Sequence, residues 1–239
     1  MVFKNMKYFF KPFYKDLSCL SRGHYFWIRQ TKEYNNIYKL YLIFKNMEIL
    51  IIIGSTRKNR FSEKPANWIF EEAKKRKECT VELIDLRNYP IPFFDEEISP
   101  SMAKEPYLNE NVRKLSKKIE KADGFIIVTP EYNHGYPAVL KNMLDYIYNE
   151  WNKKAIGFVS YGSVGGARSV EQLRQVAIEL QMAPIRQSIH IPTQLFFDII
   201  MKKIDISNPF ESLKPQADSF FDQLIWWTNA LKNAREQKN

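Results

Sequence analysis

The sequence predicts an α/β fold, a doubly wound five-stranded parallel sheet in a three-layer αβα arrangement. Short apolar runs that end at glycine or proline are typical of strands buried on both faces, and residues 49–53, which stop at Gly54, are the clearest example. From Met47 onward, five strand patterns alternate with helical patterns. This alternation favours parallel strands that are joined through helices.

The expected elements follow in order along the chain. The first helix is expected to have Pro65 in its first turn and Trp68, Ile69 and Ala73 on its inner face. The prolines within residues 88–101 predict a long irregular loop, because proline interrupts regular hydrogen bonding. Strands are expected at residues 49–53, 80–86, 123–129, 155–161 and 185–191, and the later helices at residues 111–121, 137–149, 168–181 and 214–232.

The composition predicts a soluble globular protein. The 239-residue chain is 45% hydrophobic and 15% aromatic, which is enough for a large core. No apolar run approaches the roughly 18 residues that a membrane helix needs. Cys19 and Cys79 have neither metal-ligand nor redox spacing, and histidines are few, so we expect no zinc or iron–sulfur site. A reduced, cytoplasmic setting without membrane contact is the simplest interpretation.

Residues 1–46 differ from the rest of the chain. They hold nine basic residues against Asp16 and Glu33, whereas the remaining residues are nearly neutral, so the net charge of +9 does not indicate a nucleic-acid partner. We therefore divide the chain into an extension, residues 1–46, and one domain, residues 47–239. The extension is translated upstream sequence with Met47 as the working start, an organelle-targeting peptide, or a disordered or partner-binding arm, and the abrupt change in composition favours the first.

The loop after the first strand has the chemistry of an anion site. It is rich in hydroxyls and cations and leads into a helix, whose free N–H groups and dipole attract negative charge. It contains neither G-x-G-x-x-G nor G-x-x-x-x-G-K-[ST], so dinucleotide and P-loop sites are disfavoured. A single monophosphate and a solvated basic loop are the two interpretations of these residues: Ser55, Thr56, Arg57, Lys58, Arg60 and Ser62.

Two further strands end in unusual loops. Residues 129–137 read T-P-E-Y-N-H-G-Y-P, and residues 160–168 read S-Y-G-S-V-G-G-A-R with three of the eight glycines. Such loops let backbone groups approach a flat ligand closely. In an open parallel sheet, ligands bind at the carboxyl ends of the strands, so we expect the three loops to form one site.

These motifs resemble the NADPH-dependent FMN reductase family, whose relatives include azo-, quinone- and chromate-reducing flavoproteins. The similarity rests on G-S-T-R after the first strand, P-E-Y-N followed by L-K-N after the third, and S-Y-G with G-G after the fourth, and it spans residues 47–198. It implies a flavodoxin-like fold that binds FMN. It places the FMN phosphate on Ser55, Arg57 and Ser62, with Arg60 as a weaker candidate, and the isoalloxazine ring beside Pro130, Glu131, Tyr132, Asn133, Ser160, Tyr161, Gly162, Gly165 and Gly166.

The resemblance also implies the activity. FMN would take a hydride from NAD(P)H, with NADPH as the co-substrate, and pass electrons to a flavin, quinone, azo or similar small-molecule acceptor. We expect no single catalytic side chain, and a homodimer or homotetramer. The alternatives are a flavodoxin-type electron carrier and a non-catalytic FMN-binding module. Gly135 departs from the family pattern, in which serine often follows the histidine, and this puts the contact there in doubt.

Several other residues have structural interpretations. His134 is interpreted as a loop residue without a catalytic role, His190 as a core or strand-end residue, and Glu131 as a partner in a surface or subunit-interface pair. Lys141 and Asp145 have the i,i+4 spacing of a surface ion pair. The stripe of Met143, Ile147 and Trp151 is interpreted as core or interface, and Trp68, Trp226 and Trp227 as packing residues.

Overall fold

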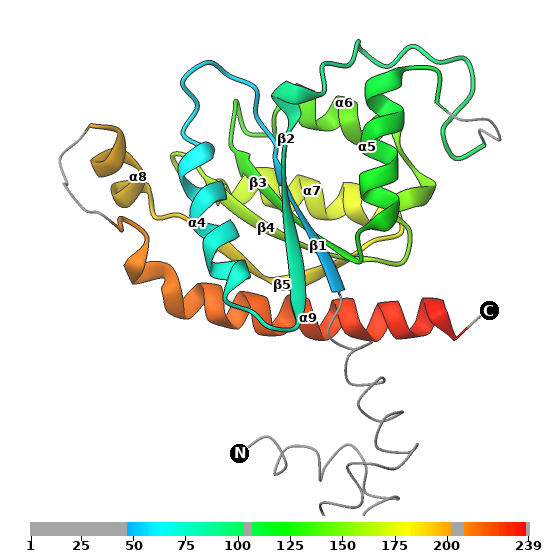
Figure 1. Cartoon of the computed structure of the whole chain (residues 1–239). Coiled ribbons are helices and arrows are strands. Elements are labelled where there is room, and N and C mark those ends of the chain that lie inside the picture. The colour runs from blue at the N-terminus through cyan, green and yellow to red at the C-terminus, as the bar shows by residue number, and fades with distance from the viewer. Residues whose placement is uncertain (1–46, 103–106, 202–207, 238–239) are drawn as a thin grey trace, which may run out of the picture. The chain divides into compact units, whose positions relative to one another are not determined.

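The five expected strands form one parallel sheet in the order β2-β1-β3-β4-β5 (Figure 1). The computed structural model describes residues 47–102, 107–201 and 208–237, and the predictions for residues 1–46 lie outside these ranges. Each strand lies within two residues of its expected position. The strands are β1 (Met47–Ile53), β2 (Cys79–Asp85), β3 (Gly124–Pro130), β4 (Ala155–Tyr161) and β5 (Ala183–His190).

The strand order confirms the doubly wound, flavodoxin-like fold. The chain steps from β1 outward to β2 and then returns past β1 to β3, so the direction of winding reverses between β1 and β3. At such a reversal the loops after the two strands diverge to opposite faces of the sheet, and a crevice remains between them. The loops that follow β1 and β3 are two of the three predicted site loops.

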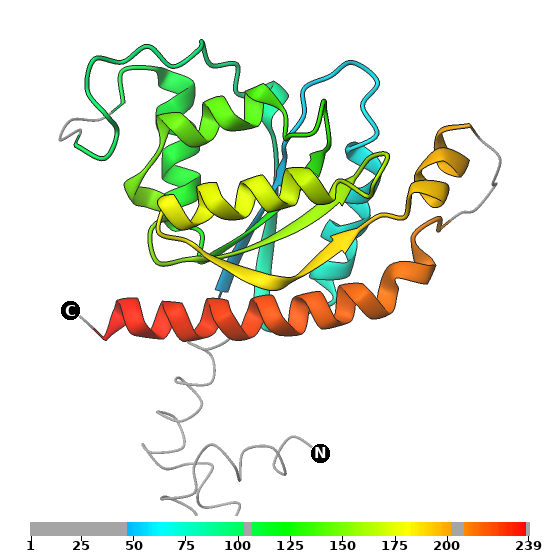
Figure 2. The ribbon, with the colours of Figure 1, turned by 180° about the vertical axis from the view of Figure 1, so that it is seen from behind.

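Helices cover both faces of the sheet. They are α4 (Glu63–Lys74), α5 (Glu110–Lys121), α6 (Ala138–Tyr146), α7 (Ala167–Glu179), α8 (Thr193–Ile200) and α9 (Lys214–Glu236). Figure 1 shows α4 and α5 on opposite sides of the sheet, and the view from behind in Figure 2 shows α7 lying across the strands with α9 below it. Within the described ranges, no helix combines the length and the apolar character needed to cross a membrane.

Two hydrophobic cores lie on the two faces of the sheet. The alternation of side chains along β1 sends Ile49, Ile51 and Ile53 to one core and Leu50 and Ile52 to the other. The first core also contains the inner faces of α4 and α9, and the second contains those of α5, α6 and α7. All seven residues of β3 and of β4 are buried, as expected for central strands of a parallel sheet.

Two elements differ from the sequence prediction. The third expected helix, α6, stops at Tyr146 because the chain becomes extended at Ile147, whose carbonyl accepts a hydrogen bond from Trp151 Nε1 at 3.0 Å. Helix α8 was not expected at all. It has no fully buried residue, and it packs on the first core through partly buried apolar side chains that include Phe196.

The structure also decides between interpretations of the apolar side chains. Met143, Ile147 and Trp151 are buried core residues of the second cluster, and Trp68 is buried in the first. The packing role expected for two other tryptophans is wrong. Trp226 is 62% exposed and Trp227 is 40% exposed, because α9 presents Ala217, Phe220, Phe221, Leu224 and Thr228 to the sheet.

Two polar features of the fold also bear on the predictions. Lys141 and Asp145 form the expected ion pair on α6, with Nζ 2.6 Å from Oδ2. Cys79 lies buried at the start of β2 as a free thiol. Burial, helped by the nearby charge of Glu78, raises the pKa of this thiol to about 11.

Truncation of Trp151 tests the second core. Trp151 is fully buried and meets Phe125 edge to face, with ring centroids 4.7 Å apart. We expect Trp151→Ala to lower the free energy of unfolding by about 3–5 kcal/mol, because the substitution leaves a large cavity and an unpaired carbonyl. Urea denaturation measures this loss. Trp226→Ala is the matched control, with an expected change within about 0.5 kcal/mol, and similar losses in both variants would contradict the assignment of the core.

Candidate functional site

The loops after β1, β3 and β4 lie side by side at the carboxyl edge of the sheet. Backbone hydrogen bonds continue past the strand ends, from Gly54 N to Val128 O at 2.9 Å and from Glu131 N to Tyr161 O at 3.0 Å. A Cβ atom at Gly54 would lie 2.9 Å from Leu140 Cδ2 and 3.2 Å from the Val128 carbonyl oxygen, so this close approach favours glycine. The expected convergence of the three loops is therefore present.

Two serine–tyrosine hydrogen bonds tie the first loop to the other two. Ser55 Oγ lies 2.9 Å from Tyr132 Oη, and Ser62 Oγ lies 2.6 Å from Tyr161 Oη. Both serines are completely buried. Burial raises the pKa of Tyr161, so its hydroxyl stays protonated and able to donate. These four residues, all predicted for the site from three separate stretches of sequence, thus meet in space.

The second loop contains a tight two-residue hairpin. Tyr132 and Gly135 exchange backbone hydrogen bonds of 2.8 and 3.1 Å around Asn133 and His134, whose φ angles are 48° and 75°. Positive φ at both central residues is the signature of a type I′ turn, and asparagine tolerates it better than most residues. Gln172 Nε2 on α7 donates to the His134 carbonyl at 2.9 Å and holds the turn. Contacts within the chain therefore define the shape of this loop.

Gly135 lies close to the side chain of Gln172 on α7. A Cβ atom there would lie 2.9 Å from Gln172 Oε1, the end of a flexible side chain. A side chain at this position would push Gln172 aside and weaken its hydrogen bond to the His134 carbonyl.

Glu131 is not the surface or subunit-interface partner that we expected. Its side chain is only 4% exposed, and Oε1 accepts from Arg168 Nη1 at 2.9 Å. Oε2 accepts from the Arg168 backbone N–H at 3.2 Å, in the first turn of α7. A carboxylate at a helix N-terminus is favoured by the helix dipole. Glu131 therefore joins the second loop to α7 within the chain, and the Pro130 carbonyl does the same by accepting from Ser169 Oγ at 2.9 Å.

The third loop depends on its glycines. Gly162, Gly165 and Gly166 have φ angles of 154°, 66° and 75°, which side chains rarely adopt. At Gly166 a Cβ atom would also lie 2.7 Å from Ser160 Cβ and 2.8 Å from Tyr161 N. The turn therefore brings backbone back over the end of β4, which only glycine permits.

His190 is a strand-end residue, as one of its two interpretations held. It ends β5, and its Nδ1 lies 2.8 Å from Ser160 Oγ. Ser160 Oγ donates its one hydrogen to Gly165 O at 2.7 Å, so Nδ1 of His190 carries the proton between them. Burial of this side of the ring lowers the pKa of the imidazole. The pair fastens the glycine turn to the neighbouring strand.

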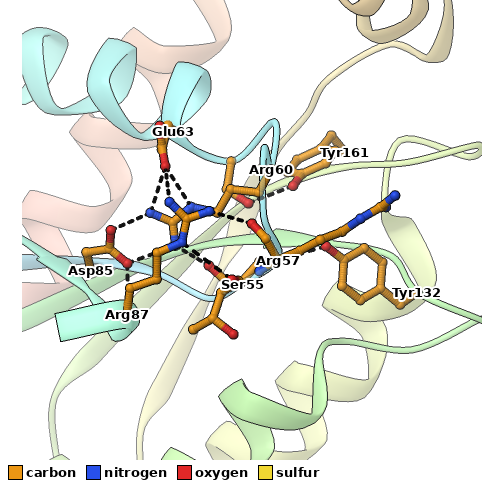
Figure 3. Close-up of polar contacts among 10 residues, drawn as sticks. Ser55, Arg57, Arg60, Glu63, Asp85, Arg87, Tyr132 and Tyr161 are labelled. Atoms are coloured by element: carbon orange, nitrogen blue, oxygen red, sulfur yellow. Dashed lines mark hydrogen bonds and ion pairs between the residues drawn. The ribbon is translucent and has the colours of Figure 1, made fainter. Parts of the chain in front are cut away.

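The two predicted arginines of the first loop lie in different surroundings (Figure 3). The Arg60 side chain is completely buried, and its guanidinium donates to the Ser55 carbonyl, to both Asp85 oxygens and to Glu63 Oε1. Arg57 extends away from this cluster toward Tyr132 and is exposed, and within the described ranges its guanidinium makes no hydrogen bond or ion pair. Arg57 is therefore available to an anion, whereas the fork of Arg60 is occupied.

Sequence reasoning missed the residues around Arg60. Asp85 ends β2 and Arg87 follows it, and Glu63 opens α4. Burial alone would lower the pKa of Arg60, but its hydrogen bonds and charge interaction with Asp85 outweigh that effect and raise it. Burial likewise opposes the ionisation of Asp85, yet hydrogen bonds from Arg60 and the Arg87 N–H lower its pKa. Both groups are thus held charged. The local signal was Asp85 at the end of a strand with Arg87 two residues later, but only the strand order places these residues beside the loop after β1.

The first loop has the donors that a phosphate monoester requires. The backbone N–H groups of Thr56 and Lys58 make no hydrogen bond to any described residue, and the residue between them, Arg57, has an exposed guanidinium that makes none either. The loop leads into the N-terminus of α4, where the dipole favours negative charge. The second and third loops offer an aromatic hairpin and a glycine turn suited to a flat ring. The residues present therefore fit FMN.

The chain is similar in sequence to known proteins. Residues 47–195 match the model of the NADPH-dependent FMN reductase family. An NAD(P)H-dependent FMN reductase of Schizosaccharomyces pombe is 40% identical over 147 residues, which are 61% of this chain and 74% of that protein. An FMN-dependent NADPH-azoreductase of Staphylococcus saprophyticus is 29% identical over 187 residues, covering 75% of this chain and 94% of the relative.

A solved structure shares the fold. The flavoenzyme NAD(P)H:(acceptor) oxidoreductase FerB from Paracoccus denitrificans superposes with a TM-score of 0.58 at 21% identity, over 77% of this chain and 98% of FerB. At 21% identity, this structural similarity is evidence for the fold only. The family match covers β1 to the start of α8 and therefore includes all three loops of the site. The chain belongs to the NADPH-dependent FMN reductase family.

Proposed function

We propose that this chain is an FMN-dependent oxidoreductase that oxidises NAD(P)H and reduces a small-molecule acceptor of the flavin, quinone or azo class. The observation that carries the proposal is the meeting of three family motifs at the β1/β3 switch point, where this strand order takes FMN. The acceptor classes are supported by the names of relatives, which include an azoreductase of Staphylococcus saprophyticus and a quinone reductase of Escherichia coli.

The proposed assignment of residues follows the geometry of the loops. Arg57 would contact the phosphate together with the N–H groups of Thr56 and Lys58. Ser55 and Ser62, also expected to hold the phosphate, have fully buried hydroxyls that bind Tyr132 and Tyr161, so they would support the loop behind it. Arg60, the weaker candidate, would act from beneath the loop because its donors are already used. The flavin ring would be bordered on one side by Pro130, Glu131, Tyr132 and Asn133, and on the other by Ser160, Tyr161, Gly162, Gly165 and Gly166.

The protein's contribution to the reaction is to bind and to orient. Bound FMN supplies the hydride and electron chemistry. Tyr132 and Tyr161 fix the spacing of the loops through their serine partners, and the Glu131–Arg168 pair keeps the hairpin against α7. Backbone N–H groups of the glycine turn would stabilise negative charge on the ring edge that they face. No side chain needs to donate or accept the transferred hydride, so a variant that still binds FMN should keep its activity.

Three further features are part of the proposal. The domain would comprise residues 47–239, with residues 1–46 as an extension to it. The protein would work in the cytoplasm, the setting that its cysteine usage favours. It would form a homodimer or homotetramer, as the family resemblance implies.

Turnover with a quinone tests the proposed reaction. Purified full-length protein loaded with FMN is mixed with NADPH and a benzoquinone under anaerobic conditions, so that oxygen cannot reoxidise the flavin, and loss of nicotinamide absorbance is followed. We expect steady oxidation that requires both FMN and quinone, since the flavin must be reoxidised in every cycle. Bound FMN without turnover would instead indicate an electron carrier or a non-catalytic module, and failure to bind FMN would refute the proposal.

Removal of the Arg57 guanidinium tests the phosphate site. We expect Arg57→Ala to weaken FMN binding by about ten- to a hundred-fold, because a charge-assisted hydrogen bond contributes about 1.5–3 kcal/mol. The rate at saturating FMN should stay close to that of the wild type. Fluorescence titration of FMN measures the affinity. Lys74→Ala, which removes a surface ion pair with Glu71, is the control, and an equal effect in both variants would argue against a phosphate at Arg57.

A further inference from the structure

We infer that Arg87, which lies outside the family motifs and follows β2, positions the phosphate-binding amides of the first loop without touching the phosphate. The inference rests on the proposed function, because it takes the first loop as the phosphate site. Arg87 lies in a short turn, residues 86–88, and its side chain is about one-third exposed. Its guanidinium reaches back across the sheet edge to the loop after β1 (Figure 3).

Each of the three nitrogens of this guanidinium has a partner in or beside the loop. Nη2 donates to the Arg57 carbonyl, Nε donates to the Thr56 carbonyl at 3.4 Å, and Nη1 pairs with Glu63 Oε1 at 2.7 Å. Arg60 adds a hydrogen bond to the Ser55 carbonyl. Three consecutive carbonyl oxygens of the loop, at residues 55, 56 and 57, are therefore drawn toward one pair of arginines.

Because the peptide bond is planar, the direction of these three carbonyls also fixes the direction of the N–H groups that follow them. In a trans peptide the C=O of one residue and the N–H of the next point in opposite directions, and the described chain has no cis bond. Carbonyls 55, 56 and 57 point at the arginines, so the N–H groups of Thr56, Arg57 and Lys58 point away from them. The Arg57 N–H donates to Ser55 Oγ at 3.3 Å, whereas those of Thr56 and Lys58 make no hydrogen bond to any described residue. Successive N–H groups turned to one side form an anion-binding concavity.

The positive charge of Arg87 is balanced by nearby carboxylates. Its effect on a bound phosphate is therefore not a direct electrostatic attraction. Arg60 and Arg87 face Glu63 and Asp85, two cations against two anions. The cluster therefore adds little net field at the loop, and the free positive charge there belongs to Arg57 and Lys58. The effect of Arg87 on a bound phosphate comes through the geometry of the backbone.

Binding of FMN and of riboflavin, which lacks the phosphate, tests this role. Dissociation constants are measured by flavin fluorescence for the full-length wild type, Arg87→Ala and Arg87→Lys, at low and high salt. We expect Arg87→Ala to weaken FMN binding by about ten-fold or more and to change riboflavin binding by less than about two-fold. Lysine should restore only part of the loss, because a single ammonium lacks the fork that spans two carbonyls.

A matched control is available on the same side of the fold. Arg76 also pairs with two carboxylates, Asp218 and Asp222, and donates to a carbonyl, but it lies beyond the far end of α4. Arg76→Ala should leave the ratio of the two dissociation constants unchanged. Thermal unfolding of each variant shows whether it is folded, and Arg87→Lys carries the test if Arg87→Ala does not fold.

The outcomes separate this inference from the function on which it rests. Equal affinity of the wild type for FMN and riboflavin would refute the phosphate site itself. A strong preference for FMN that Arg87→Ala leaves intact would overturn the role of Arg87 alone, as would equal loss of both ligands. A loss that shrinks at high salt, or that lysine restores in full, would mark a direct charge contact and would also overturn the positioning role.

Discussion

The site depends on the direction of peptide groups at the ends of parallel strands. Such a strand leaves its last amides unpaired unless a neighbour or a ligand takes them, and here the backbone pairing extends one residue past the strand ends. Beyond that point the chain supplies its own constraints, which are arginines on carbonyls in the first loop, a type I′ turn in the second and left-handed glycines in the third. Each constraint fixes which way the amides face.

Side chains from distant parts of the sequence then hold the three loops together. The serine–tyrosine pairs are separated by 77 and 99 residues along the chain, and Glu131 reaches Arg168 on α7. An aromatic cluster adds α8 to this arrangement, because Phe61 meets both Tyr161 and Phe196 edge to face with centroids 4.8 and 4.9 Å apart. A preformed site of this kind loses little entropy when a ligand binds.

The strands and the loops of the site were predictable from local sequence patterns. Contacts between residues far apart in the sequence were not, because they depend on the strand order and on which helix face is buried. Apolar runs that end at glycine, such as residues 49–53, located the strands, and their loops carried the family motifs. Arg87 was missed because its role depends on β2 lying beside β1, which no local spacing reveals. The partner of Glu131 lies 37 residues away, so its pairing was assigned to the surface instead. On α9, apolar residues occur on both faces, and the inward face could not be chosen for Trp226 and Trp227.

The buried thiol of Cys79 has a consequence for chemical durability. Quinones are electrophiles as well as oxidants, and they arylate cysteine through its thiolate. With its pKa raised to about 11 and its sulfur enclosed at the start of β2, Cys79 remains protonated at neutral pH and out of reach. The part of the chain that the structure describes therefore offers such compounds no reactive thiol, so arylation by a quinone is not expected within the sheet and helices of this domain.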